Sequence, residues 1–514
     1  MHGRSSLLSD LYFGKNRADD GHNRRALRSG AVAIAARVTN AAVQIGSVLF
    51  LARLLTPEDY GLVSMVAAIV GFAPLVVDLG TRDAVVQRPA ITEREVSAIF
   101  WITTGLSSVL TVAVAASGPL IARLYGEPRL VTIALVSSLT FISSALTCQH
   151  YALLRRAMLF EKLGVLEVVA NVVAAVTAIA MAFLGFHYWA LVVRPIVYAF
   201  TLSGGVWWQC RWVPTRPAIT PDVKKMLHFG VNITGFTMTD FLSRSADRVA
   251  IGYRFGAATL GHYQNALFVF ENFIDILLGA LHGVAVSGLS KVQHDPKALW
   301  TAFSKALALL TFFAMPAFGV LAVTSQDLIV LMLGEKWTDA GVLLSIVALR
   351  GIPQSFERTH GWLHVAMART DRWMRWGLIS AVAQLLTLLA GLPFGPKGVA
   401  ASNVACMLVL AVPSITYAGG PIGVRTADVL LTVWRPLTAS IVAVVVGFAL
   451  RVTVFGDLTA LARTIALAAC YVGVYVVVAV GLLRERRSLQ LALWLAKESL
   501  PASLARLVPS FRES

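Results

Sequence analysis

Charged side chains recur within segments of this sequence that are otherwise apolar. Four of them share one helical face, at positions i, i+4, i+7 and i+8: Asp240, Arg244, Asp247 and Arg248. An ionised side chain at the centre of a bilayer costs on the order of 2.5–3.5 kcal/mol, so such residues normally face a helix bundle or a wet cavity. The spacing therefore indicates a polar interior rather than a lipid-facing surface.

Arginine is prominent among these charges, and its planar guanidinium can bind a phosphate group through two parallel hydrogen bonds. We predict that six arginines line a cationic cavity and contact phosphate: Arg37, Arg194, Arg244, Arg248, Arg350 and Arg358. The alternative is that these arginines form salt bridges between helices. Arg244, for example, could pair with Asp240 or Asp247 on its own helix.

Five carboxylates in the same segments are candidates for ion coupling or for a gate: Asp240, Asp247, Glu271, Asp275 and Glu357. Glu271 and Asp275 stand at i and i+4 and could exchange a proton or a sodium ion in a wet cavity. They could equally pair with Arg244 or Arg248. The sequence leaves both interpretations open.

Motifs for metal, nucleotide or catalytic chemistry fail on their spacing. Glu357 and His360 are three residues apart, as di-iron ligands are, but that site needs a second such pair, which the sequence lacks. The stretch Gly391–Gly398 does not match G-x-x-x-x-G-K-[ST], so no ATP-driven pump is predicted. The loops are also too short for a catalytic domain. We therefore expect no metal, no cofactor and no enzymatic activity.

The composition places these charges in a membrane protein. The 514 residues are 57% hydrophobic and 14% charged, whereas soluble domains are about 25% charged. The formal net charge is +16, but membrane proteins collect Lys and Arg in cytoplasmic loops for topological reasons. We therefore expect the lipid bilayer, and no nucleic acid, as a partner.

The apolar segments predict an all-α integral membrane protein with about 14 transmembrane helices, since a span needs about 20 apolar residues. They form six spans, six more after a proline-containing loop, and a final pair: 30–52, 61–81, 97–122, 130–154, 163–185, 188–209; 226–251, 261–287, 299–324, 341–367, 376–393, 398–417; 436–455 and 461–483. We expect two six-helix lobes around a central cavity, followed by a C-terminal helix pair.

The corresponding domain boundaries follow the changes in hydropathy and charge. We predict a basic cytoplasmic N-tail, an N-lobe, a cytoplasmic linker, a C-lobe, helices 13 and 14, and an amphipathic cytoplasmic tail, at 1–28, 29–210, 211–225, 226–420, 421–487 and 488–514. Under this division 29 Lys and Arg lie in the loops and tails on the side of the N-terminus, and 8 lie on the opposite side. The positive-inside rule therefore places both termini in the cytoplasm.

Two motifs carry a family resemblance. The stretch LARLLTPEDYGLVSM spans Leu51 to Met65, and SRSADRVAIGYRFGAATLGHYQNA spans Ser243 to Ala266. They resemble the lipid-linked oligosaccharide flippases of the polysaccharide-transporter family, within the multidrug/oligosaccharidyl-lipid/polysaccharide exporter superfamily. Gly61 and Gly261 stand 200 residues apart, each after the first helix of its six, as a duplicated lobe requires.

The resemblance implies a specific cargo and location. It implies alternating-access export of a polyprenyl-diphosphate-linked oligosaccharide across the bacterial inner membrane for lipopolysaccharide or exopolysaccharide biosynthesis, with polysaccharide polymerase machinery as a further partner. The alternatives are a peptidoglycan-precursor or drug exporter of the same superfamily, and a membrane-embedded polymerase, ligase or acyltransferase. A drug-cation exporter would favour an acidic cavity, whereas the intramembrane charges here are rich in arginine.

The topology is tested by labelling from each side of the membrane. We expect tags at Met1 and Ser514 to be cytoplasmic and a cysteine introduced at Glu335 to be external, because an odd number of spans would invert the charge bias. Cysteine-accessibility labelling measures this. If position 335 reacts only from the cytoplasmic side, the fourteen-span topology is wrong.

Overall fold

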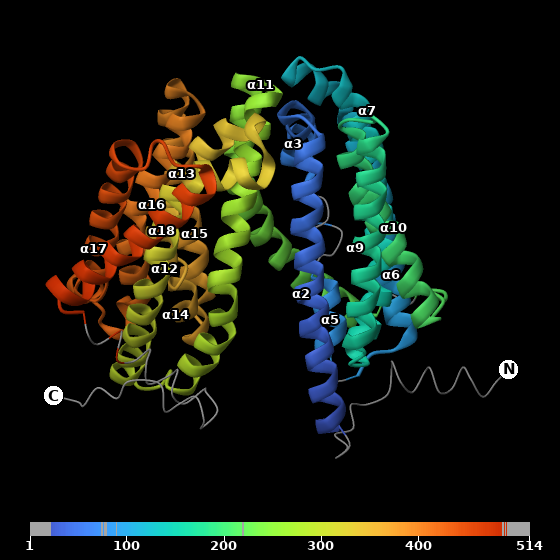
Figure 1. Ribbon diagram of the computed structural model, residues 1–514. Helices are drawn as coiled ribbons and strands as arrows, with labels where there is room; N and C mark the ends of the chain where they lie inside the picture. Colours follow the sequence, from blue (N-terminus) through green and yellow to red (C-terminus); the bar gives the residue numbers. More distant parts are fainter. Residues whose placement is uncertain are drawn as a thin grey trace. The chain divides into compact units, whose positions relative to one another are not determined.

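The computed structural model describes residues 22–72, 76, 80–88, 90–217, 220–485, 488 and 490, and these are helical, with short connections and no strand among them (Figure 1). Some side chains within the helices, including those of Asp240 and Arg244, lie outside the described part. The chain divides into two compact units, Met1–Gly261 and His262–Ser514. The predicted lobe boundaries around residues 211–225 stay a prediction.

The first unit is built from long helices joined by short turns. In chain order they are α2 (His22–Leu54), α3 (Pro57–Val70), α5 (Thr81–Gln87), α6 (Glu93–Tyr125), α7 (Arg129–Ser137), α8 (Leu139–Arg156), α9 (Phe160–Phe183), α10 (Trp189–Cys210) and the first part of α11 (Pro221–Lys291). Its core includes buried His150, which stacks on Trp207 with ring centroids 4.0 Å apart and lies 3.0 Å from the carbonyl oxygen of Trp212.

The second unit continues from α11 into α12 (Pro296–Leu333), and α12 packs against several later helices. The elements that follow α12 are η1 (Glu335–Trp337), α13 (Thr338–Glu357), α14 (His360–Ala366), α15 (Thr370–Gly391), η2 (Leu392–Phe394), α16 (Gly395–Gly419), η3 (Gly420–Ile422), α17 (Thr426–Thr453), α18 (Ala460–Val476) and η4 (Val477–Leu482). Among them, α13, α17 and α18 make the most extensive contacts with α12. The final helices α17 and α18 contact each other and α12 (Figure 1).

The described residues contain nine helices that are long and apolar enough to cross a membrane. Ten predicted spans fall within them, because Asp371–Ile422 includes two. The remaining predicted spans are 61–81, where α3 ends at Val70, and three segments that contain charged residues: 226–251, 261–287 and 341–367. The count of fourteen spans therefore stays a prediction.

A break in α11 separates two of the predicted spans. Gly256 has φ 83° and ψ 178° inside this helix, a conformation that is accessible to glycine and strained for other residues. The break lies between the predicted spans 226–251 and 261–287. It confirms that the continuous apolar sequence here forms two helices rather than one.

Buried carboxylates cap the N-termini of two helices. At α3 the backbone N–H of Asp59 donates to Thr56 Oγ1 at 3.2 Å, and the backbone N–H of Thr56 donates to Asp59 Oδ2 at 2.9 Å. Thr92 and Glu95 form the same reciprocal cap at α6. Such caps satisfy backbone N–H groups that the helix leaves unpaired. These two acids are therefore structural.

The glycines of the two family motifs make reciprocal backbone contacts within the first unit. A Cβ atom on Gly61 would lie 1.7 Å from the carbonyl oxygen of Ala257, and one on Gly261 would lie 1.8 Å from that of Pro57. Pro57 and Ala257 are themselves 200 residues apart, like the glycines. The two contacts therefore obey the same internal symmetry as the sequence. Only a residue without a side chain fits at either position.

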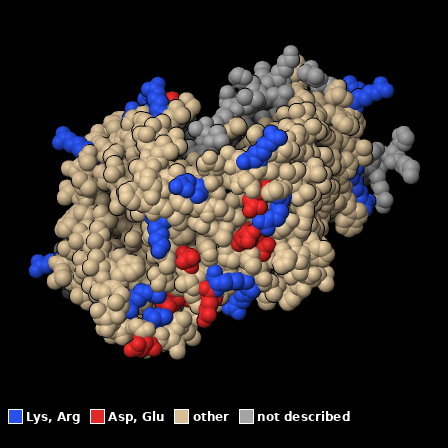
Figure 2. All heavy atoms as spheres, turned by 90° about the horizontal axis from the view of Figure 1, so that it is seen from above, with Lys and Arg blue, Asp and Glu red and all other residues tan. Residues whose placement is uncertain are grey.

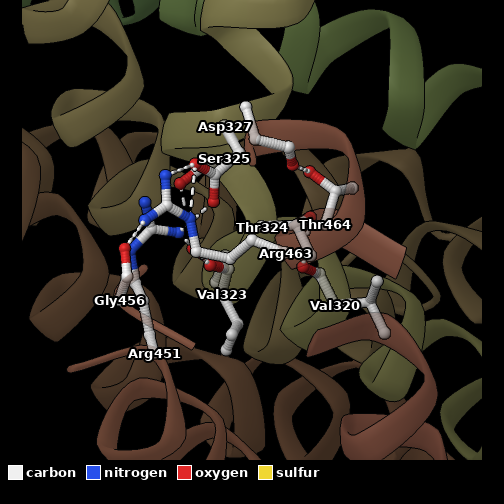
Figure 3. A network of polar contacts seen from close by, with 11 residues as sticks. Val320, Val323, Thr324, Ser325, Asp327, Arg451, Gly456, Arg463 and Thr464 are labelled. Atoms are coloured by element: carbon white, nitrogen blue, oxygen red, sulfur yellow. Dashed lines mark hydrogen bonds and ion pairs between the residues drawn. The ribbon is translucent and has the colours of Figure 1, made fainter. Parts of the chain in front are cut away.

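A buried ionic cluster joins the last two helices to α12 (Figure 3). Asp327 on α12 is 4% exposed at its side chain and accepts from Arg451 Nη1 at 2.7 Å through one oxygen and from Arg463 Nη2 at 2.8 Å through the other. Arg451 also donates to the carbonyl of Val323, and Arg463 donates to that of Gly456. Arg451 lies in α17 and Arg463 lies in α18.

The glycine contacts predict that Gly61→Ala and Gly261→Ala each destabilise the protein. The added methyl group meets rigid backbone rather than a flexible side chain, and overpacking of this kind costs about 1–3 kcal/mol. Thermal unfolding of the purified protein in detergent measures the loss. The matched control is Gly105→Ala on α6, where a Cβ meets nothing within 4 Å. Equal stability of all three variants would contradict the close approach.

The ionic cluster predicts a large effect of Asp327→Asn. This change leaves two buried guanidinium groups without their carboxylate, and breaking a buried ion pair costs about 3–5 kcal/mol. The control is Glu58→Gln, which removes an exposed bridge to Arg129 at 2.7 Å and should cost about 1 kcal/mol or less. Unfolding midpoints of the two variants decide the matter. If they match, the cluster does not hold the helix pair.

Candidate functional site

The predicted site arginines of the first unit differ in their surroundings. Arg37 lies on an exposed part of α2, and Arg194 is half-buried on α10, where it interacts electrostatically with Tyr60 on α3. Arg248 is half-buried on α11, and its backbone N–H donates to Asp247 Oδ1 at 2.7 Å. Asp240 and Arg244, the other members of this predicted face, have side chains outside the described part. Convergence of these residues on one cavity stays a prediction.

A polar chain that the sequence analysis missed crosses the first unit. The guanidinium of Arg82 on α5 lies 5.0 Å from the ring centroid of Tyr151 on α8, and the Tyr151 hydroxyl donates to Glu167 Oε1 on α9 at 2.6 Å. Arg82 is a loop residue by sequence, and tyrosines are common in apolar segments. Only the packing of three helices brings Arg82 to the ring and Glu167 to the hydroxyl of one tyrosine.

Arg350 is the clearest candidate for an anion contact in the second unit. Its Nε donates to Gln354 Oε1 at 3.2 Å, and its guanidinium lies 4.9 Å from the ring centroid of Phe270. The side chain is half-buried, and no carboxylate among the described residues forms an ion pair with it. A neutral amide and an aromatic ring position this charge without neutralising it.

Arg358 has a carboxylate partner. Its Nη1 lies 3.4 Å from Asp275 Oδ1, with the two side chains 31% and 74% exposed. The sequence analysis considered Arg244 and Arg248 as partners for Asp275, and the structure pairs it with Arg358 instead. Glu271 lies one turn earlier on α11 and is half-buried. An exposed pair contributes little to stability, so Arg358 and Asp275 can exchange partners at low cost.

Glu357 and His360 lie on either side of the break between α13 and α14. His360 Nδ1 is 3.5 Å from Glu357 Oε1 and 2.5 Å from the Glu357 carbonyl oxygen. Within the described ranges, no three His, Cys, Asp or Glu side chains are placed to hold a metal ion together.

The face seen in Figure 2 presents few charges on a surface of other residues, and its acidic side chains lie beside basic ones. An exposed ion pair also joins α7 to α3, because Arg129 lies 2.7 Å from Glu58 and 3.0 Å from Glu127. This mixture of signs differs from the interior of the second unit, where Arg350 has a positive charge and no carboxylate within ion-pair distance among the described residues.

Curated proteins of surface-polysaccharide biosynthesis resemble this chain over much of their length. The Lipopolysaccharide biosynthesis protein WzxC of Escherichia coli (strain K12) is 25% identical over 416 residues, covering 79% of this chain and 84% of its own. The Succinoglycan biosynthesis transport protein ExoT of Rhizobium meliloti (strain 1021) is 25% identical over 340 residues, covering 66% and 68%. The Teichuronic acid biosynthesis protein TuaB of Bacillus subtilis (strain 168) is 24% identical over 337 residues, covering 63% and 68%.

Solved structures share the fold at low identity. The Lipid II flippase MurJ, in an inward closed conformation, is 14% identical with a TM-score of 0.66 and covers 89% of this chain and 99% of its own. An inward-facing multidrug resistance MATE family transporter of the MOP superfamily is 14% identical with a TM-score of 0.61, covering 74% and 94%. They confirm the predicted fold class, an all-α membrane transporter fold.

The family assignment rests on more than half of the chain. The family described as "Polysaccharide biosynthesis protein" matches residues 50–342, a range that contains both motifs around Gly61 and Gly261. The predicted resemblance is confirmed, and this multi-pass membrane chain belongs to the polysaccharide biosynthesis protein family.

Proposed function

We propose that this protein flips a polyprenyl-diphosphate-linked oligosaccharide from the inner to the outer leaflet of the bacterial cytoplasmic membrane, for surface polysaccharide biosynthesis. The family, the transporter fold and the named relatives support this function. They also support the prediction that the chain is a transporter rather than an enzyme. Polymerase machinery that consumes the exported repeat unit is the further partner we propose.

The chemistry of the cargo explains why a protein is needed. The sugars and the diphosphate cannot cross hydrocarbon, whereas the polyprenyl chain can remain in lipid. A cavity for this cargo must therefore be wet and cationic. Rocking between inward-open and outward-open states would then move the headgroup, as in other transporters with repeated lobes. We propose that the loops rich in Lys and Arg face the cytoplasm, so that both termini lie there.

The surroundings of Arg350 give the strongest support for the proposal. Its guanidinium lies on a helix of a membrane transporter fold, half-buried, beside an amide and an aromatic ring and without a carboxylate among the described residues. A buried cation without a counter-ion is costly, and an anionic ligand would offset that cost. The diphosphate of the cargo is such a ligand. Arg37, Arg194, Arg244, Arg248 and Arg358 are proposed as further contacts.

The energy source is proposed to be an ion gradient. Glu271 and Asp275 are the carboxylates proposed to exchange a proton or a sodium ion, with Asp240, Asp247 and Glu357 as further coupling or gate residues. The bridge from Asp275 to Arg358 supports a gate role, because a pair that is 74% and 31% exposed can open without a large desolvation cost. Cargo phosphate arriving at Arg358 would release Asp275 for ion binding.

Substitution of Arg350 tests the cationic site. We expect Arg350→Ala to weaken binding of a diphosphate-linked lipid about tenfold or more, because a charge-assisted contact is worth roughly 1.5–3 kcal/mol. Arg350→Lys should recover only part of the affinity, since it lacks the planar fork. Binding to the purified protein is measured beside monophosphate and neutral analogues, and the other five arginines are changed in the same way.

The control is Arg129→Ala, which removes an exposed arginine paired with Glu58 and Glu127. This variant should bind the cargo normally. Membrane abundance of the Arg350 variants should also be normal, because removing a charge makes the span more apolar. Full binding by the Ala variants, or unchanged preference for the diphosphate over the neutral analogue, would leave these arginines a structural role.

A further inference from the structure

A fully buried histidine in the second unit has no hydrogen-bond partner in the described part of the chain. His364 on α14 is 0% exposed, and both its Nδ1 and its Nε2 lack a partner there. A neutral imidazole carries one donor and one acceptor, so this residue leaves both unsatisfied. Buried polar groups of this kind are rare in folded proteins and need an explanation.

The titratable and charged groups near His364 are His360 on α14 itself, Asp371 and Arg372 on α15, and Tyr417 on α16. Glu357 on α13 contacts His360 rather than His364. The rings of His360 and Tyr417 lie 5.7 Å and 6.2 Å from that of His364. Arg372 lies 4.3 Å from the Tyr417 ring centroid and donates to the Tyr417 carbonyl at 2.6 Å. The histidine thus lies between cations and carboxylates.

The described conformation suits an unprotonated imidazole. A charged His364 would carry two N–H donors with no acceptor in contact, close to the guanidinium of Arg372. The carboxylate of Glu357 is already in contact with His360 at 3.5 Å. A proton on His364 therefore needs a different arrangement, in which Glu357 or Asp371 moves toward the ring.

The rearrangement would involve the turn between α13 and α14, whose two residues keep helical dihedrals, with φ −57° and ψ −21° at Arg358 and φ −72° and ψ −18° at Thr359. Arg358 and Thr359 separate the end of α13 from the start of α14, and they lie between Glu357 and His360. A change in the angle between the two helices would move His364 relative to Glu357. The same turn carries Arg358, the residue paired with Asp275. Protonation of His364 and release of the bridge between Arg358 and Asp275 would thus both change the angle between α13 and α14.

We propose that His364 is a proton-binding site, empty in the described conformation and filled in the alternate state of the transport cycle. The proton comes from water and adds to the free lone pair of a ring nitrogen, and the resulting cation is compensated by Glu357 or Asp371. The coupling role rests on the proposed transport function. The alternative is a structural histidine whose nitrogens bond only to buried water.

The first test is transport by the full chain in proteoliposomes loaded with a polyprenyl-diphosphate-linked oligosaccharide. One coupled proton shifts the cargo distribution by up to about tenfold per unit of pH difference. We expect His364→Gln and His364→Asn to lose this response while transport down a cargo gradient continues. The control His150→Gln removes another fully buried histidine and should keep it. Glu271→Gln and Asp275→Asn are measured in parallel.

The second test needs no cargo and so separates the two proposals. The reporter is a bimane label on Val365→Cys, an exposed position beside His364. The label is placed in protein that carries Cys470→Ser, because the other three native cysteines are buried. Its emission reports movement of α14 relative to α13. We expect its emission to change as the pH is lowered from about 8 to about 4, because burial and the nearby Arg372 disfavour the charged ring, and His364→Gln to abolish the change.

The outcomes are distinct. If the His364 variants keep both the response to the pH gradient and the change in emission, the proton site is wrong while the flippase function stands. If the wild type moves no cargo but its emission titrates through His364, the flippase function fails and the proton site stands. If only Glu271→Gln or Asp275→Asn removes the gradient response, coupling belongs to the carboxylates and the proposal for His364 is overturned.

Discussion

The cost of an unpaired charge in hydrocarbon is the constraint on which the rest of this structure depends. Backbone N–H and C=O groups are also costly to leave unpaired in hydrocarbon, and they are paired within helices through most of the described part of the chain. Side chains avoid it in several ways. Asp59 and Glu95 are used by helix caps, and Asp327 is shared by two arginines. The charges left over after these pairings are the ones available for a ligand.

This division separates structural charges from functional candidates. The cluster at Asp327 has its carboxylate bonded through both oxygens and is nearly excluded from solvent. Arg350, by contrast, has an amide and an aromatic ring beside it. Both arginine sites lie in the second unit, on segments that the sequence predicts to span the membrane. The composition of a segment therefore does not indicate the role of its arginine, whereas a buried carboxylate partner does.

Local chemistry made much of the fold predictable. The lengths of the apolar segments predict the helices, and Gly256 ends the first half of α11 where the pattern of spans requires it. The family motifs correctly identify the family because they include Gly61 and Gly261, which no other residue type can replace. The pairing of charges was not predictable, because Asp275 and Arg358 are 83 residues apart and Asp327 and Arg451 are 124 apart. Sequence spacing on one helix cannot rank partners on another, and His364 reads as one more polar residue until its burial is known.

The reciprocal glycine contacts restrict the motions open to α3 and to the segment of α11 that crosses it. One turn of a helix is a rise of about 5.4 Å, and a slide of that size would bring Pro57 or Met65, four residues away on the same face, against the backbone that now faces Gly61. Sliding along either axis is therefore blocked in both directions. Tilting about the crossing point keeps each glycine opposite its carbonyl, so the contact behaves as a pivot with one rotational freedom and fixed register.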